Sequence, residues 1–368
     1  MIEILPADNK KNFKEFLNFP FKLYSNDPYW VPPLISDIKK QFSARNPFFR
    51  HAEVMPFIAR RNNETVGRIT AIYNRMHIDF HNEKAGFFGY FDCIDEDAVA
   101  GCLIGKTKEW LAEKGMTVMR GPMNFSINEE CGLLIEGFDS SPMIMMPYNF
   151  PYYQKLLEGC GLSKAKDLYA YTADVMDTFP EKVYRVSKVA EKQGIKIRPI
   201  NLKSFDSEMR IFKRIYDSAW GKNWGHIPMT DEEIEHMAGK LKPVIVPELA
   251  LIAELNDEPA GFMMFLPDLN YVLKKLNGRL FPFGIFRALR HSGKTKDARL
   301  LLLGIKEGAR KRGVDSLLFI EGLKALHKNG YRRMELSWVL EDNYPVQRII
   351  ETMNGRLYKK YRIYEREV

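Results

Sequence analysis

LIAELNDEPAG at residues 251–261 repeats FIARRNNETVG at residues 57–67, with matched residues 194 positions apart. In both copies, β-prone apolar residues flank a polar stretch rich in Asn, Asp and Glu, which is the composition of a hairpin turn. The identical pairs are Ile58 and Ile252, Ala59 and Ala253, Asn62 and Asn256, Glu64 and Glu258, and Gly67 and Gly261. This stretch indicates that the chain contains an internal duplication.

Two further blocks support the duplication. NFPYYQKLLEGCG (149–161) and NYPVQRIIETMNG (343–355) share the spacing of 194, as do Trp30 and Trp224. Between the blocks the spacing rises to 215, for example from Gly115 to Gly330. Each half therefore carries about 21 residues that the other lacks, at different places. We predict two domains, residues 1–178 and 179–368.

Both halves have the same predicted order of elements. A strand (2–6, 195–200) and an amphipathic helix (12–24, 208–220) precede the hairpin. A strand, a helix, a strand, a helix and a last strand follow it. The Asn and Pro that open the final helix suggest an N-cap and a first-turn proline. The fold class is therefore α+β, with a mostly antiparallel central sheet flanked by helices in each half.

The composition narrows the class of protein. The 368 residues are 45% hydrophobic and 28% charged, as in ordinary globular proteins. A net charge of +8 favours anionic ligands mildly and does not indicate nucleic-acid binding. No apolar stretch has the length of a membrane helix, and the N-terminus does not resemble a signal peptide.

The cysteine and histidine patterns indicate neither disulfides nor a metal. Cys93, Cys102, Cys131 and Cys160 form no CxxC pair, which fits a reducing cytoplasm. No histidine lies close in sequence to Cys131, so we expect a structural role for it rather than a nucleophilic one. The seven histidines show no paired ligand spacing, and we predict no catalytic metal.

Residues 300–355 resemble the GNAT family of acyltransferases (GCN5-related N-acetyltransferases). LLLLGIKEGARKRGVDSLLFIEGLKALHKNG (300–330) has a strand, a turn and a helix, and its turn matches the family pattern Arg/Gln-x-x-Gly-x-Gly/Ala at Arg310 and Gly313. Asp315 departs from that pattern, while the stretch from Asn343 to Gly355 matches the Asn-led helix of the family. Two such halves in tandem also resemble the FemAB-like aminoacyl transferases.

The resemblance implies acetyl-CoA or another acyl-CoA as co-substrate. The residues that it assigns to coenzyme A are Gly304, Ile305, Arg310, Lys311, Arg312, Gly313, Val314 and Asn343. Independently of the family, a cationic turn at a helix N-terminus suits a pyrophosphate. A solvated basic loop is the alternative interpretation. In the first half Asp95, Glu96 and Asp97 lie at this turn, so we expect coenzyme A to bind the second half only.

The catalytic groups are harder to assign. GNAT enzymes usually pair a base with a tyrosine, but here the tyrosine position falls on Ile350 or Glu351. Tyr344 is a substitute candidate, or else an aromatic residue that packs beside Pro345. Glu335 is the candidate base, or else an exposed carboxylate on the polar face of a strand.

Each half has its own insertion. Residues 125–149 form a long loop with polar and methionine residues, and we predict that it lines the acceptor pocket through Asn124 and Glu130. A loop packed at the domain interface is the alternative. Residues 271–297 hold seven Lys and Arg with Phe281, Phe283 and Phe286. They could contact an anionic surface, a tRNA or another subunit, or form an amphipathic helical hairpin.

The leading interpretation is a cytoplasmic acyl-CoA-dependent N-acyltransferase that acts on a small amine or amino acid. One alternative is a FemAB-like transferase that uses aminoacyl-tRNA; under the leading interpretation neither tRNA nor DNA is a partner. The other alternative is an acyl-CoA-binding module without catalysis. The sequence leaves a homodimer open.

Overall fold

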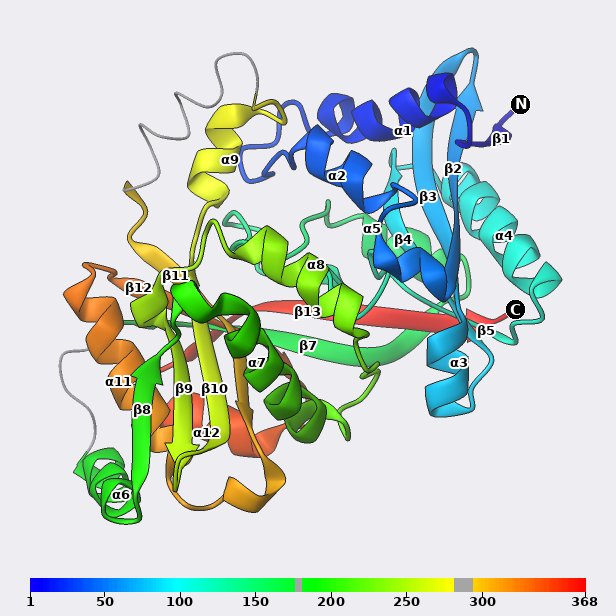
Figure 1. Cartoon of the computed structure of the whole chain (residues 1–368). Coiled ribbons are helices and arrows are strands. Elements are labelled where there is room, and N and C mark those ends of the chain that lie inside the picture. The colour runs from blue at the N-terminus through cyan, green and yellow to red at the C-terminus, as the bar shows by residue number, and fades with distance from the viewer. Residues whose placement is uncertain (176–180, 281–293) are drawn as a thin grey trace. The chain divides into compact units, whose positions relative to one another are not determined.

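The computed structural model describes residues 1–175, 181–280 and 294–368. The described residues form two compact units (Figure 1). Unit 1 comprises residues 1–169, 272–280 and 359–368, and unit 2 comprises residues 170–175, 181–271 and 294–358. The predicted boundary between residues 178 and 179 lies outside the described residues.

The two halves of the sequence share a common order of elements, to which the first half adds β6 and the second adds α6, η2 and η5. The first half contains β1 (Glu3–Pro6), α1 (Lys10–Leu23), α2 (Ile35–Gln41), η1 (Pro47–Arg50), β2 (Ala52–Arg61), β3 (Glu64–Asn74), α3 (Arg75–His81), β4 (Ala85–Cys93), α4 (Asp97–Glu113), β5 (Val118–Gly121), β6 (Leu133–Glu136), α5 (Tyr153–Gly159) and β7 (Ser163–Asp174). The second contains α6 (Glu181–Lys192), β8 (Ile195–Pro199), η2 (Leu202–Ser204), α7 (Phe205–Trp220), α8 (Asp231–Leu241), η3 (Pro247–Leu249), β9 (Ala250–Leu255), β10 (Glu258–Pro267), α9 (Asn270–Leu276), β11 (Asp297–Ile305), η5 (Glu307–Ala309), α11 (Val314–Lys328), β12 (Arg333–Leu340), α12 (Tyr344–Thr352) and β13 (Arg356–Glu367).

The repeated sequences form equivalent hairpins, β2–β3 and β9–β10. The two central residues of each turn have positive φ, 48° and 65° at Asn62 and Asn63, and 53° and 62° at Asn256 and Asp257. Asn and Asp tolerate this left-handed backbone, which tight hairpins require. The predicted turns are confirmed.

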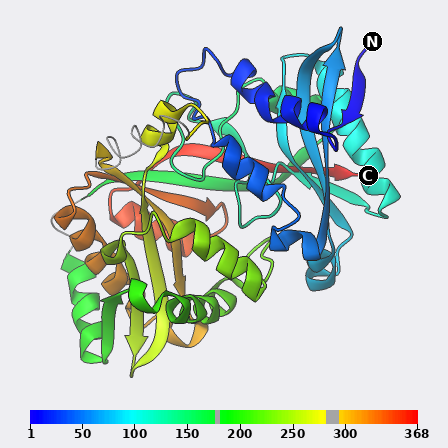
Figure 2. The same cartoon turned by 45° about the horizontal axis from the view of Figure 1, so that its top comes forward.

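Helices cover both faces of each hairpin in the same way. A Cβ on Gly67 would lie 2.8 Å from Leu103 of α4, and one on Gly261 would lie 3.1 Å from Val314 of α11. The next residue points to the other face in each copy. Arg68 donates to the carbonyl of Phe16 on α1, and the Phe262 ring contacts Phe212 on α7. Figures 1 and 2 show α7 and α11 flanking β9 and β10.

In each unit the strand pairs whose register is described include a parallel pair with a short register. In unit 1 the strand order is β1-β2-β3-β4-β5-β13-β7, and β6 also pairs with β13. In unit 2 it is β7-β12-β11-β10-β9-β8. β4–β5 and β11–β12 are parallel, whereas both repeated hairpins are antiparallel. The last strand of each half, β7 or β13, has residues in both units. This confirms the predicted fold class.

The predicted capping asparagines do not cap. The side chain of Asn149 accepts from Leu134 N at 2.7 Å and donates to Leu134 O at 3.1 Å, so it holds β6 instead. Asn343 stands at the N-cap position of α12 without a side-chain capping bond, although Pro345 does lie in the first turn. The Asn-x-Pro pattern thus marks the start of α12, whereas α5 begins only at Tyr153, after both Asn149 and Pro151.

The two insertions differ in how much of them is described. In the first, Met143 and Met146 are buried and β6 pairs with β13. The second begins with α9, after which Gly278 packs against the Phe21 ring. Phe281, Phe283 and Phe286 lie outside the described residues. No helix in the described ranges is long and apolar enough to cross a membrane.

Candidate active site

The turn between β11 and α11 presents the cations that the sequence predicted. Arg310, Lys311 and Arg312 are exposed, and the backbone is left-handed at Lys311 (φ 62°) and Gly313 (φ 81°). Gly313 is the N-cap of α11, so the N–H groups of the first helical turn lack intrahelical partners. Charge and backbone donors therefore meet at one helix end, as an anion site requires. Asp315 adds an opposing negative charge in the first turn.

Arg310 and Gly313 have structural roles that the motif did not predict. Arg310 donates to Ala219 O at 3.0 Å and to Ile305 O at 3.4 Å, which ties the turn to the end of α7. A Cβ on Gly313 would lie 2.9 Å from the Val186 side chain, so the glycine also lets α6 pack against the turn. Lys311 and Arg312 are therefore better placed than Arg310 to meet a phosphate.

The strands that lead to this turn separate before they reach it. β11 and β12 pair only from Asp297–Leu300 and Arg333–Leu336. Beyond this point both strands continue, and the described residues show no pairing between them. Leu301, Leu302 and Leu303 are partly exposed along the opening. An unpaired strand edge can receive an extended ligand through backbone hydrogen bonds. Gly304 and Ile305 lie at its far end, beside the cationic turn.

Glu335 is buried where the two strands begin to part. Its exposed fraction is 0%, so the interpretation as an exposed strand carboxylate is wrong. The two carboxylate oxygens accept hydrogen bonds from the hydroxyls of Ser337 and Tyr358. Arg299 Nε lies 3.5 Å from Oε1 and donates to Ser337 Oγ at 2.8 Å. A buried carboxylate needs such partners, because an unpaired charge in the interior is costly.

The tyrosine that contacts Glu335 is Tyr358 rather than Tyr344. Tyr344 is 63% exposed at the start of α12. Tyr358 is partly buried on β13. Tyr358, which the sequence did not suggest, therefore contacts the candidate base, whereas the predicted Tyr344 faces solvent.

The corresponding opening in unit 1 is closed by the chain itself. β4 and β5 pair from Ala85–Phe87 and Val118–Arg120. Beyond them Met123 N donates to Phe88 O at 2.7 Å, and Asn124 Oδ1 accepts from Tyr90 N at 2.9 Å. Asn124, predicted to bind the acceptor, thus satisfies the edge of β4.

Side chains of unit 1 extend this closure. Tyr153 OH accepts from Cys93 N at 3.0 Å, and Tyr24 OH donates to Asp92 at 2.8 Å. Arg68 pairs with the same carboxylate at 2.7 Å. Burial, with a smaller contribution from Asp92, raises the pKa of Tyr24 well above its ordinary value, so its hydroxyl stays protonated. The backbone and side-chain polar groups at the end of β4 thus already have hydrogen-bond partners within unit 1.

The acidic turn of unit 1 also lies where the duplication predicts. α4 begins at Asp97, the last residue of this turn. Glu96 forms an ion pair of 2.5 Å with Arg61, and the hydrogen bond from Arg61 lowers the pKa of Glu96. Negative charge stabilises a helix N-terminus and repels a phosphate there. Unit 1 thus has neither the cations nor the open strand edge of unit 2.

Asn124 and Glu130 lie together in unit 1. Asn124 Nδ2 donates to Glu130 Oε2 at 3.2 Å, and Asn124 N donates to Glu130 O at 2.8 Å. Both side chains are partly buried. The pairing gives them a role in shaping the loop, and their role toward an acceptor stays a prediction.

Arg299, Ser337 and Tyr358 were not predicted as site residues from the sequence. Arg299 interrupts the apolar run DARLLLL and stands directly opposite Glu335 in the parallel register. A charged residue inside a central strand was the available signal. Tyr358 carries no such signal, because it is one of several tyrosines in β13 and reaches Glu335 only through the fold.

The cysteines and other metal-binding side chains form no further centre within the described ranges. All four cysteines are free, with Cys93 and Cys131 buried. No group of three or more His, Cys, Asp or Glu residues there could hold a metal ion.

The chain is similar to known proteins over nearly its full length. It is 36% identical to protein YghO of Escherichia coli over 98% of this chain and 94% of that protein. It is 35% identical to the bacterial ceramide synthase of Caulobacter vibrioides, over 99% and 97% of the two chains. A tandem GNAT protein from the clavulanic acid biosynthesis pathway matches all of this chain and 98% of its own, with a TM-score of 0.60 at 11% identity. No family model matches the sequence. The tandem GNAT fold is thereby confirmed.

Proposed function

The chain belongs to the family of YghO and the bacterial ceramide synthase, and we propose that it transfers an acyl group from acyl-CoA to an amine nitrogen. One observation carries the proposal. The opening between β11 and β12 has a buried carboxylate, Glu335, at its narrow end and a cationic helix N-terminus at its other end.

The residues along the opening fit a bound acyl-CoA. Lys311 and Arg312, with the first N–H groups of α11, suit the pyrophosphate. The open edge of β11 suits the amide groups of the pantetheine arm, and Leu301 to Leu303 suit its apolar parts. When bound, acyl-CoA supplies the activated acyl carbon. Unit 1 offers neither feature, so the proposed site lies in unit 2.

The buried cluster suits the proton transfers of N-acylation. As the carbon–nitrogen bond forms and the carbon–sulfur bond breaks, the amine nitrogen loses one proton and the sulfur gains one. Tyr358 can accept the nitrogen proton while it gives its own to Glu335, which it already contacts. The reverse transfer returns the proton to the sulfur. Arg299 balances the charge of Glu335 before the transfer.

The relatives refine the expected substrates. Ceramide is an amide between a fatty acid and a long-chain amino alcohol, and one relative is named as a ceramide synthase. This name favours a long-chain acyl group and a lipid amine over the acetyl group and small acceptor that the sequence suggested. We therefore propose a long-chain amino alcohol as the preferred acceptor.

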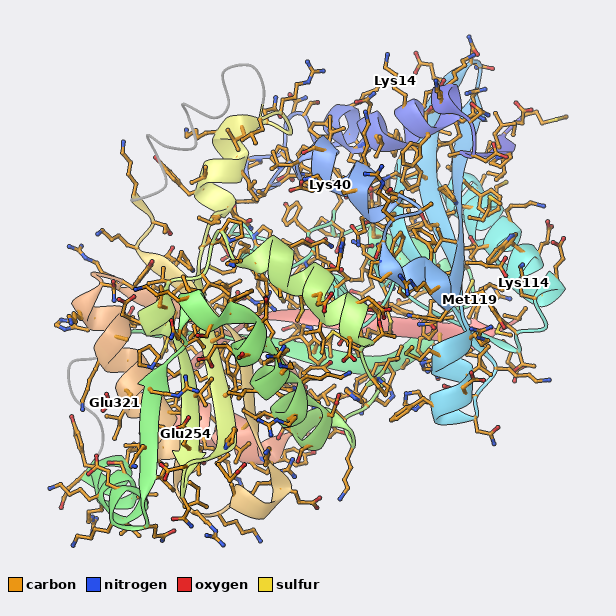
Figure 3. All side chains as sticks on the ribbon, viewed as in Figure 1. Lys14, Lys40, Lys114, Met119, Glu254 and Glu321 are labelled. Atoms are coloured by element: carbon orange, nitrogen blue, oxygen red, sulfur yellow. The ribbon has the colours of Figure 1, made fainter. Side chains whose placement is uncertain are left out.

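A substrate matrix with matched variants tests this function. Acetyl-CoA and palmitoyl-CoA are each incubated with ethanolamine, serine and sphinganine, while thiol release and the mass of the amide are measured. Glu335→Gln keeps the shape of the side chain but removes its basicity, and we expect turnover to fall by about 100-fold or more. Glu321→Gln, on α11 of the same unit (Figure 3), is the control and should stay within about twofold of the unaltered protein.

Each contrary outcome has a defined meaning. Unchanged turnover in a folded Glu335→Gln protein would exclude Glu335 as the base. Binding of acyl-CoA without any amide product would favour the non-catalytic module. A product formed only from aminoacyl-tRNA would favour the FemAB-like alternative.

A further inference from the structure

A cavity of about 340 Å³ lies in unit 2, outside the opening between β11 and β12. Its lining residues are Asp174, Met353, Asn354 and Arg356. Met353 is buried, whereas the three polar residues are exposed. The volume is that of a small-molecule site, with an apolar wall and a few polar groups.

The cavity lies at the opposite end of the parallel strands from the cationic turn. Asp174 ends β7, and the next residue, Val175, donates its N–H to Arg332 O at 2.8 Å, just before β12 begins. The cationic turn follows the other end of β11, which runs parallel to β12. Glu335 lies between the two ends. A second substrate could therefore reach this region without crossing the path of the first.

The cavity is also next to the proposed proton path. Arg356 and Tyr358 are two residues apart on β13, so their side chains leave the same face of the strand, with Cα atoms roughly 7 Å apart. Tyr358 in turn donates to Glu335. A nitrogen held beside Arg356 is thus on the face that leads to the buried carboxylate.

The charges of the cavity define the ligand. Asp174 and Arg356 carry opposite charges, yet no ion pair involves either of them in the described parts of the chain. Both side chains line the same cavity and are available to form an ion pair or a hydrogen bond with a ligand. Such an arrangement suits a molecule that has an ammonium group, a nearby oxygen and an apolar remainder.

We propose that this cavity binds the acceptor of the acyl transfer, a primary amine with an oxygen function on the neighbouring carbon or the next one. Asp174 binds the ammonium form, Arg356 donates to the oxygen, and Met353 contacts the carbon chain. After one proton leaves the ammonium for water, the neutral nitrogen attacks the acyl carbon, and its second proton passes through Tyr358. The inference rests on the proposed N-acyltransferase function.

Steady-state kinetics with single conservative variants test the site. Asp174→Asn should raise the KM for the amine at least tenfold, with kcat and the KM for acyl-CoA within about twofold. Arg356→Gln should raise the KM for ethanolamine, serine or sphinganine but not for octadecylamine, which lacks the oxygen. Asp206→Asn, an exposed acid in the first turn of α7, is the matched control. Comparison of serine with sphinganine shows whether the acceptor is an amino acid or a long-chain amino alcohol.

The outcomes separate this inference from the proposed function. If Glu335→Gln is inactive while Asp174→Asn and Arg356→Gln keep normal KM values, the acceptor site is wrong and the function stands. If the unaltered protein acylates no amine, the function fails. Titration of the protein with ethanolamine, serine and micellar sphinganine then tests the acceptor site independently of turnover. Weaker binding by Asp174→Asn than by the unaltered protein would support the site, and equal binding would contradict it.

Discussion

Arg299 and Glu335 lie directly opposite each other in the parallel register of β11 and β12, and they form a buried ion pair of 3.5 Å. Their side chains are 3% and 0% exposed. The pair stands at the last rungs before the strands separate, so it joins the strands where the proposed site begins. Each charge depends on the other, because water cannot solvate either one.

Removal of both partners should destabilise the protein less than the two single removals added together. Arg299→Met alone leaves Glu335 buried without its cation, at a cost of about 3–5 kcal/mol. The double variant Arg299→Met with Glu335→Leu removes both charges, and its loss should be clearly smaller than the sum of the single losses. Urea unfolding of the unaltered protein, Arg299→Met, Glu335→Leu and the double variant measures this coupling. Additive losses would show that the ion pair contributes nothing specific.

Charge reversal in the cationic turn should weaken coenzyme A binding. Lys311→Glu and Arg312→Glu each remove one charge-assisted contact to phosphate, worth about 1.5–3 kcal/mol. We therefore expect a loss of affinity of at least tenfold for each variant in a calorimetric titration. Asp95→Ala, in the corresponding turn of unit 1, is the control and should leave the affinity unchanged. Equal losses from both turns would contradict a site confined to unit 2.

Tyr358→Phe should lower turnover without a change in acyl-CoA affinity. The substitution keeps the ring on β13 but removes the hydroxyl that contacts Glu335. Loss of one proton-transfer group lowers the rate by about 100-fold or more. Tyr344→Phe, at the exposed start of α12, should have no effect. The reverse result would restore Tyr344 as the acid that the family resemblance suggested.

The duplication was predictable from the sequence because equivalent local structures in the two halves require the same residue types. Asn62 and Asn256 are needed at the same left-handed turn, and Gly67 and Gly261 at the same close helix contact. Each of these conformations restricts the residue type at a single position, so the matching residues can be recognised in the sequence. The cationic turn was predictable for the same reason, since its charges and its glycine are contiguous.

The interior of the site was not predictable because it depends on strand partners. Polar neighbours suggested that Glu335 was exposed, but Arg299 and Tyr358 come from other strands and satisfy it in the interior. The roles of Asn124 and Asn149 were missed because both bond to backbone groups of other elements, Tyr90 and Leu134. Sequence spacing does not report these long-range pairings.

Thiol reactivity should distinguish the cysteines. Burial raises the pKa of Cys93 well above its ordinary value, so little thiolate is present to react. Cys102 is exposed on α4. Iodoacetamide should therefore modify Cys102 in the native protein long before Cys93 or the buried Cys131, as peptide mass spectrometry can show. Rapid labelling of Cys93 would mean that β4 opens readily.

His77 should make the stability of the protein depend on pH. This histidine is buried on α3, and burial lowers its pKa to about 4, although Glu83 at 3.2 Å partly opposes the shift. In the unfolded chain the pKa is about 6.5. Between these values the unfolded chain binds a proton that the folded chain does not. The free energy of unfolding therefore falls as the pH falls from about 6.5 to about 4, by up to roughly 3 kcal/mol.

Urea unfolding of the unaltered protein and His77→Gln at pH 7, 6 and 5 tests this linkage. Glutamine can keep a hydrogen bond to Glu83 but does not titrate, so the variant should lose less stability between pH 7 and pH 5. The difference between the two proteins should then narrow steadily as the pH falls. His327→Gln, an exposed site on α11, is the control and should follow the unaltered protein. Parallel stability curves for His77→Gln and the unaltered protein would show that His77 binds its proton equally well in the folded and unfolded chains.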